Sequence, residues 1–343
     1  MKFIIAAACI SIAAVFVPVP VSSQTSQQSD QQPEQQSQQL PATTASATKL
    51  SGAQWLLKMA SSIQQRNYQI SLVVNRPSAD TVPYLWRHGV FDDGVSMEQL
   101  NILNGPGKEY IRVNRVISVF EPDAAPYSLA GNLIDGPIPS QLLLAPLALQ
   151  AGYEFIAVGR GRVSGRVAQQ IRIISRDNTR YSYQLWVDEE TAMPLKLNML
   201  DLNGQLVKQV QVSQIQVTDE PDAYFDRINH AMLPPVSAPA QTIHQHGWRI
   251  AYLPTGMREV RRNTHRLVIT GQVVEYAMLS DGLVEVSIYV MPAVNADVQN
   301  NFYRHEAKTL LTLVEGDVQV SVIGEIPPQT ANKIATSLSA RIQ

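Results

Sequence analysis

Residues 167–217 read VAQQIRIISRDNTRYSYQLWVDEETAMPLKLNMLDLNGQLVKQVQVSQIQV and give the clearest strand pattern in the chain. This stretch divides at polar turn dipeptides, namely Asp177-Asn178, Glu189-Glu190 and Asn203-Gly204. The segments between them are 167–175, 179–188, 194–201 and 206–217. In the second segment Tyr181, Tyr183, Leu185 and Val187 alternate with Ser182, Gln184, Trp186 and Asp188, so one face is apolar. The stretch therefore predicts an antiparallel, strongly curved β-meander.

The residues before this meander predict one helix and more strands. Apolar residues recur at helical spacing from near Ser51 to Ile63, so we expect a helix that packs on the sheet. Further β-rich runs are 68–76, 84–91, 108–120 and 153–158. Residues 135–152 are crowded with leucine and interrupted by Pro137, Pro139 and Pro146, which predicts short helical pieces capping one mouth of the sheet.

The residues after the meander predict a linker and a second, smaller domain. Residues 222–243 lose the strand alternation and are stiffened by three prolines. Residues 244–343 then contain runs typical of strands at 249–253, 273–279, 283–291, 309–314 and 318–325. A hairpin turn is expected at Ser280-Asp281-Gly282, and a terminal helix at 331–338. The chain is thus predicted to be α+β, with a large domain at 49–221 and a smaller one at 244–343.

The amino terminus indicates export. Lys2 precedes an apolar run, 3–17, and small residues follow at Val21 and Ser23, so residues 1–23 are predicted to be a signal peptide. Cys9, the single cysteine, lies in this run, which leaves no thiol chemistry after cleavage. Residues 24–48 are rich in Gln, Ser, Thr and Pro and are predicted to be a disordered tether. A net charge of -2 gives no basic field of the kind that nucleic-acid binders carry.

Catalytic and metal-binding patterns are weak. The glycines of 159–165 are followed by a predicted strand rather than a helix, so we interpret this stretch as a flexible interstrand loop and not a phosphate loop. His244 and His246 have no nearby third ligand, so no metal or cofactor is predicted. No catalytic constellation is indicated by spacing, which argues against an enzyme; a hydrolase is the least favoured alternative.

Two groups of residues suggest binding. Arginines cluster at Arg160, Arg162, Arg166, Arg172, Arg176 and Arg180, either as a solvated sheet face or as contacts for phosphorylated head groups or acidic partner segments. Trp86, Trp186, Met193 and Met199 either form plain core or line a cavity inside an incompletely closed barrel. In the second case the proline-broken leucine stretch would act as a lid.

Several longer motifs carry a family resemblance. In the first domain they are Val158-Gly159-Arg160, Arg176-Asp177-Asn178-Thr179-Arg180-Tyr181-Ser182-Tyr183, Trp186-Val187-Asp188 and Leu200-Asp201-Leu202-Asn203-Gly204. In the second they are Tyr252-Leu253-Pro254-Thr255-Gly256, Leu279-Ser280-Asp281-Gly282-Leu283 and Val322-Ile323-Gly324-Glu325-Ile326-Pro327-Pro328-Gln329-Thr330-Ala331. With these motifs in order from about Ser51 to Ala340, the chain resembles the RseB/MucB family of envelope-stress regulators.

The resemblance implies a periplasmic, non-catalytic protein whose large domain is an unclosed β-barrel like LolA and LolB. Such a protein binds the periplasmic part of a transmembrane anti-sigma factor of the RseA/MucA type and shields it from regulated proteolysis. Acyl chains of lipoproteins or lipopolysaccharide release it. A lipoprotein or lipid carrier is the alternative function, and homo-oligomer formation is left open.

We hypothesise two residue sets for this function. The lipid-sensing wall is placed at Leu142, Leu143, Leu144, Leu147, Trp186 and Met199. Contacts to an anionic head group or to the partner are placed at Arg160, Arg162 and Arg180. The partner is expected to dock mainly on the second domain and the face between the two domains.

Overall fold

The computed structural model describes residues 49–236, 246–266, 271–293 and 300–340. The predicted signal peptide and tether lie outside the described residues. From Lys49 onward the chain forms one compact unit that holds a large sheet domain and a smaller one. The exact ends of the two domains stay a prediction, because residues 237–245 of the expected linker are not described.

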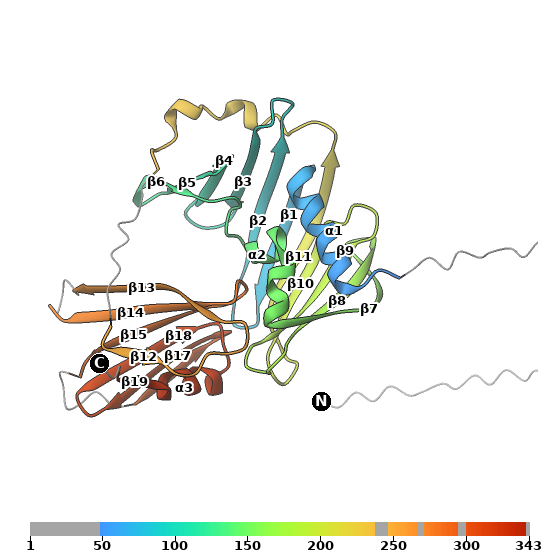
Figure 1. The fold of residues 1–343 in the computed structure, drawn as a ribbon. Coiled ribbons are helices and arrows are strands. Elements are labelled where there is room, and N and C mark those ends of the chain that lie inside the picture. Colours follow the sequence, from blue (N-terminus) through green and yellow to red (C-terminus); the bar gives the residue numbers. More distant parts are fainter. Residues whose placement is uncertain (1–48, 237–245, 267–270, 294–299, 341–343) are drawn as a thin grey trace, which may run out of the picture. The chain divides into compact units, whose positions relative to one another are not determined.

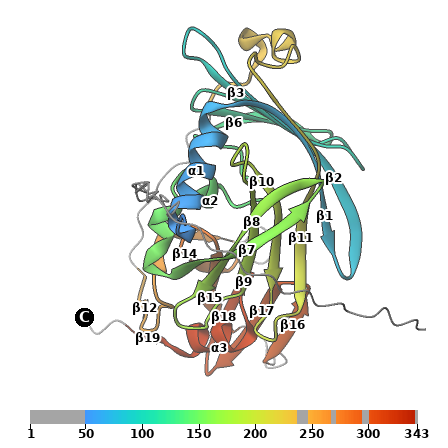
Figure 2. The ribbon, with the colours of Figure 1, turned by 90° about the vertical axis from the view of Figure 1, so that its right-hand side faces the viewer.

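The larger sheet has eleven antiparallel strands in the order β6-β5-β4-β3-β2-β1-β11-β10-β9-β8-β7. Its edges, β6 and β7, do not pair with each other, so the sheet is not closed. Figures 1 and 2 show its strands curving past the helix α1. The strands are β1 (Asn67–Arg76), β2 (Ala79–Val90), β3 (Ser96–Ile102), β4 (Glu109–Val113), β5 (Val116–Glu121), β6 (Ala124–Ala130), β7 (Tyr153–Val163), β8 (Arg166–Ser175), β9 (Ser182–Asp188), β10 (Pro194–Leu200) and β11 (Leu206–Thr218).

The predicted meander is confirmed as β8 to β11. Burial alternates along β9 as predicted. Tyr183, Leu185 and Val187 are buried, whereas Gln184 and Trp186, which lie between them, are only partly buried. Strand β11 then pairs with β1, which joins the meander to the amino-terminal half of the sheet. This pairing makes one continuous apolar face from both halves.

Three helical pieces cover the apolar face. Helix α1 (Gly52–Gln65) begins at a capping box in which Ser51 and Gln54 satisfy each other's backbone N–H groups. It buries Trp55, Leu56, Met59 and Ile63. The predicted short helices are confirmed as α2 (Ser140–Leu144) and the 3-10 helix η1 (Pro146–Ala151), and both pack against α1. We call residues 140–151 the leucine segment.

Some predictions for this domain were wrong. The run 108–120 is two strands, because Asn114 adopts φ 53° in a hairpin turn that an asparagine tolerates. The stretch 159–165 is not a flexible loop: 159–163 belongs to β7 and pairs with β8, and only Ser164 and Gly165 form the left-handed turn. Strands β3 and β6 were missed, since buried polar residues in β3 and exposed apolar ones in β6 break the expected alternation.

The smaller sheet has six antiparallel strands in the order β13-β14-β15-β18-β17-β16. They are β13 (Arg258–Arg266), β14 (Val273–Ser280), β15 (Glu285–Pro292), β16 (Asn301–His305), β17 (Lys308–Glu315) and β18 (Val318–Gly324). Helix α3 (Pro328–Thr336) packs on β17 and β18, and β12 (Trp248–Ile250) pairs with β19 (Leu338–Ala340). The α+β fold class is therefore confirmed, although the edge strands β13 and β16 were not predicted.

The residues between the two sheets include two short helices. These are η2 (Phe225–Arg227) and η3 (His230–Met232), and Phe225 is buried. Farther along, the Ser128 hydroxyl donates to the carbonyl oxygen of Pro234 at 2.7 Å, so the end of the described stretch lies against β6.

Candidate functional sites

Side chains fill the apolar interior of the larger sheet. Leu142, Leu143 and Met199 are at most 2% exposed and belong to one core cluster. The gap left beneath the leucine segment measures about 10 Å³ and is lined by Leu72, Trp86, Leu100, Ile134, Gly136, Pro137, Ile138 and Leu143. A gap of that size holds one water at most, so an acyl chain fits only if the leucine segment moves.

The predicted lipid-sensing wall is only partly brought together. Met199 pairs with Tyr183 and shares the inner face with it, whereas strand alternation places Trp186 on the opposite face. There the Lys196 ammonium lies 5.1 Å from the centre of the Trp186 ring. Leu144 is half-buried at the margin of the core, and Leu147 is 40% exposed.

A wider pocket opens beside the closed gap. It measures about 310 Å³ and is lined by Ile63, Gln64, His88, Ser96, Arg112, Asn132, Leu133 and Leu144. Leu133 and Leu144 are the chain neighbours of Ile134 and Leu143, which line the closed gap. Its lining mixes the apolar side chains of Ile63, Leu133 and Leu144 with polar side chains from five other residues.

A buried ion pair supports the polar wall of this pocket. The Arg112 Nε donates to Glu98 Oε2 at 2.7 Å, and the Trp86 indole N–H donates to Glu98 Oε1 at 2.8 Å. Glu98 is fully buried; burial raises its pKa, while the charge of Arg112 lowers it. Sequence reasoning missed this pair, and its only signal is a charged residue, Arg112, inside the β-rich run 108–120.

His88 lies next to this pair as a neutral side chain. Its Nδ1 donates to the carbonyl oxygen of Arg66 at 2.8 Å, and Ser96 lies 3.2 Å from its Nε2. Burial lowers the pKa of His88 to about 4. The ring stacks on Tyr68, so the polar wall continues into the core.

The three predicted anion-binding arginines lie in different surroundings. Arg160 on β7 is 72% exposed and pairs with Glu189 at 2.6 Å. Arg162, exposed on the same strand, donates to the carbonyl oxygen of Gly165. The side chain of Arg180 is fully buried, and its NH1 donates to Asp281 Oδ2 of the smaller domain at 2.8 Å. These arginines do not form one patch.

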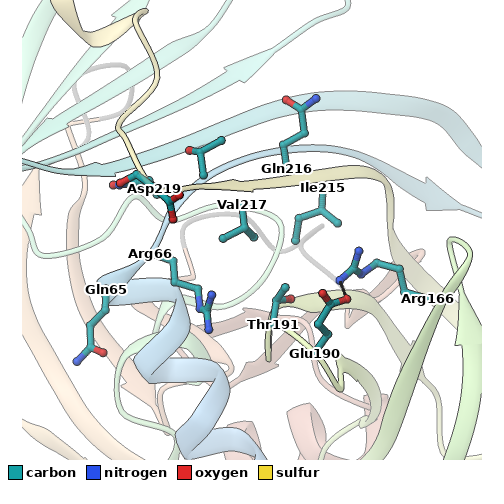
Figure 3. A pocket seen from close by; sticks show the side chains of 11 residues that line it. Gln65, Arg66, Arg166, Glu190, Thr191, Ile215, Gln216, Val217 and Asp219 are labelled. Atoms are coloured by element: carbon teal, nitrogen blue, oxygen red, sulfur yellow. Dashed lines mark hydrogen bonds and ion pairs between the residues drawn. The ribbon is translucent and has the colours of Figure 1, made fainter.

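A large polar pocket lies at the end of α1 and measures about 890 Å³ (Figure 3). It is lined by Gln65, Arg66, Asn67, Arg166, Glu190, Thr191 and residues 215–219. Figure 3 shows Arg166 paired with Glu190, and Arg166 also pairs with Asp188. Cations and carboxylates are mixed here, so the pocket favours neither anions nor cations.

Two family profiles cover most of the chain. The MucB/RseB N-terminal domain matches residues 51–237, and the MucB/RseB C-terminal domain matches residues 242–339. This chain belongs to the MucB/RseB family. The resemblance inferred from the sequence motifs is thus confirmed.

Relatives within the MucB/RseB family match along most of their length. The Sigma-E factor regulatory protein RseB of Escherichia coli (strain K12) is 32% identical over 300 residues, covering 87% of this chain and 93% of the relative. The Sigma factor AlgU regulatory protein MucB of Pseudomonas aeruginosa (strain PAO1) is 28% identical over 309 residues, with the same coverage.

Solved structures of MucB match the fold. MucB in complex with MucA(peri) gives a TM-score of 0.66 at 26% identity, over 85% of this chain and 100% of that chain. The Pseudomonas aeruginosa MucA/MucB complex gives 0.68 at 26% identity, over 85% and 99%. MucB solved alone gives 0.53 at 25% identity, over 84% and 98%.

Within the residues that the structure describes, this MucB/RseB family member has no group of three or more His, Cys, Asp and Glu side chains that could hold a metal ion. His244 lies outside the described residues, and His246 contacts the carbonyl oxygen of Asn263 through Nε2. None of the helices in this described part of the chain has the length and apolar character to cross a membrane.

Proposed function

We propose that this chain is a periplasmic, non-catalytic regulator that binds the periplasmic part of an RseA/MucA-type anti-sigma factor and shields it from regulated proteolysis. The observation that carries the proposal is the family match across both domains, 51–237 and 242–339. MucB, a relative with the same two domains, has been solved together with MucA. No observation favours the lipid-carrier alternative over the regulator.

The test is binding of the mature chain to the periplasmic segment of an anti-sigma factor from the same organism. Titration calorimetry should give a dissociation constant in the micromolar range or tighter, and the bound segment should be cleaved more slowly by an added protease. Absence of a complex at protein concentrations of about 100 µM, roughly 5 kcal/mol of binding free energy, would refute the proposal.

We further propose that this regulator senses an acyl chain. Supporting this, the leucine segment covers the apolar interior and is interrupted by Pro146, and the half-polar pocket of about 310 Å³ adjoins the gap beneath it. A chain that displaced the leucine segment would bury apolar surface at about 25 cal/mol per Å². That gain has to exceed the loss of the packing of Leu142 and Leu143.

Trp86 offers a direct probe, because its ring lines the gap. With Trp55, Trp186 and Trp248 replaced by Phe, Trp86 is the last of the four tryptophans. A brominated fatty acid should then quench its emission. Replacing Leu143 and Leu144 by Asp should abolish both the quenching and any lipid-triggered release of the partner. Release that persists in this variant would show that the acyl chain binds elsewhere.

The exposed arginines remain candidates for a head group. Arg160 and Arg162 face solvent on β7, so a phosphorylated head group can reach them without a change in the fold. Replacing both with Gln should weaken binding of phosphorylated lipids and leave binding of simple fatty acids unchanged.

A further inference from the structure

The turn after β14 places Asp281 in a buried polar site on the larger domain. Its Oδ2 accepts from the Tyr153 hydroxyl at 2.9 Å and from Arg180 NH1 at 2.8 Å. Its Oδ1 accepts from the backbone N–H groups of Leu283 and Val284, both at 2.9 Å. The side chain is 2% exposed, so this carboxylate has left water and depends on these four donors.

A second carboxylate also links the two domains, but this one belongs to the larger domain and accepts from the smaller one. Asp177 of the larger domain accepts from the backbone N–H of Thr255 at 2.6 Å, and also from Thr179 and Arg180 NH2. Burial raises the pKa of Asp177, but these hydrogen bonds outweigh it and hold the pKa well below its usual range. Each domain therefore supplies a carboxylate to donors on the other.

Two glycines of the smaller domain, Gly256 and Gly282, allow its backbone to approach the larger domain closely beside these carboxylates. Gly256 adopts φ 82°, and a Cβ there would lie 2.7 Å from the Cα of Gly152. Gly282 adopts φ 94°, and a Cβ there would lie 2.7 Å from Gln141 Cγ and 3.2 Å from Leu149 Cδ2. The turn that carries Asp281 therefore rests on the leucine segment itself.

We infer that Tyr153, Asp177, Arg180, Thr255 and Asp281 form a latch that holds the two domains in the arrangement that binds the partner; this inference rests on the proposed function. The fold is closer to MucB solved with MucA than to MucB alone. The leucine segment contacts the latch on one side and covers the apolar interior on the other. A ligand that displaces this segment therefore also removes the support beneath Asp281.

The test is Asp281→Asn, which keeps the shape of the side chain but removes one of the two carboxylates that pair with the buried Arg180 guanidinium, the other being Asp177. Spin labels are attached at Ser61→Cys and Asp317→Cys, two exposed positions in different domains. The parent chain should give one narrow distance distribution, and Asp281→Asn a broad one. Affinity for the anti-sigma periplasmic segment should fall about tenfold or more. Asp80→Asn, an exposed aspartate on β2, is the control and should change neither readout.

The two measurements separate failure of the latch from failure of the proposed function. A single narrow distance with unchanged affinity in Asp281→Asn overturns the latch. A parent chain that does not bind the partner refutes the proposed function, while the distance measurement still tests whether Asp281 holds the domains together. If Asp281→Asn fails to fold, Tyr153→Phe replaces it, since it removes one donor to Asp281 and leaves the charges paired; it should broaden the distances less.

Discussion

At the scale of single residues, the buried pair of Glu98 and Arg112 should contribute strongly to stability. Glu98→Gln leaves the Arg112 guanidinium, 4% exposed, without a charged partner. Removing one partner of such a pair costs about 3 to 5 kcal/mol, so urea unfolding should show a loss of that order.

The matched control for this pair is Glu121→Gln. Glu121, the last residue of β5, pairs with Lys108, and both side chains are about one-third exposed. Exposed pairs contribute about 1 kcal/mol or less, so the control should lose little. Equal losses in the two variants would contradict the assignment of Glu98 as a structural carboxylate.

His88 should make the fold less stable in mild acid. Its pKa is about 4 in the folded chain and about 6.5 when unfolded, so between these values the unfolded state binds the proton and the folded state does not. Stability is therefore unaffected above pH 6.5 and is lost as the pH falls toward 4. From pH 7 to pH 5 the loss is about 2 kcal/mol.

The measurement is urea unfolding at both pH values for the parent chain and for His88→Gln. This substitution should remove most of the fall in stability, whereas His305→Gln, an exposed control on β16, should leave it unchanged. The same fall in His88→Gln as in the parent would assign the effect to other groups.

At the scale of elements, the leucine segment stabilises the interior it covers. Leu143→Ala should cost about 2 to 5 kcal/mol, because Leu143 is 2% exposed and lines the closed gap. Leu147→Ala, on the 40% exposed side of the same segment, should cost about 1 kcal/mol or less. Thermal unfolding of both variants measures the difference, and similar losses would mean that the segment is not anchored through α2.

The elements differ in how far their sequence predicts them. The meander was predicted because turn dipeptides and strict alternation coincide in 167–217. Strand β3 was not, since Glu98 and Gln99 are buried in it and their partners come from other strands. Arg180 shows the same limit: as one of six clustered arginines it was predicted to lie on a solvated face or to contact a head group or partner, but it is buried and pairs with Asp281, 101 positions away.

At the scale of the whole molecule, the two domains have separate cores that meet at few points. One core lies under the larger sheet and the other between the smaller sheet and α3, and Leu283 packs against both. Polar pairs such as Lys208 with Glu325 and Arg76 with Glu306 add to the contact between the domains. Polar groups can exchange partners for water at little net loss, so such a junction can open without unfolding either core.

The junction and the leucine segment together predict reciprocal binding. If an acyl chain lowers the affinity of this regulator for its partner by a given factor, thermodynamic linkage requires the partner to lower acyl-chain affinity by the same factor. Quenching of Trp86 by a brominated fatty acid, titrated with and without a saturating anti-sigma periplasmic segment, measures one factor. Partner titrations with and without the fatty acid measure the other. We expect equal factors of roughly 5 to 150 in the parent chain.

In Asp281→Asn both factors should shrink toward one, because the partner-binding arrangement of the two domains is no longer held. Factors that stay large and equal in this variant would place the coupling outside the latch.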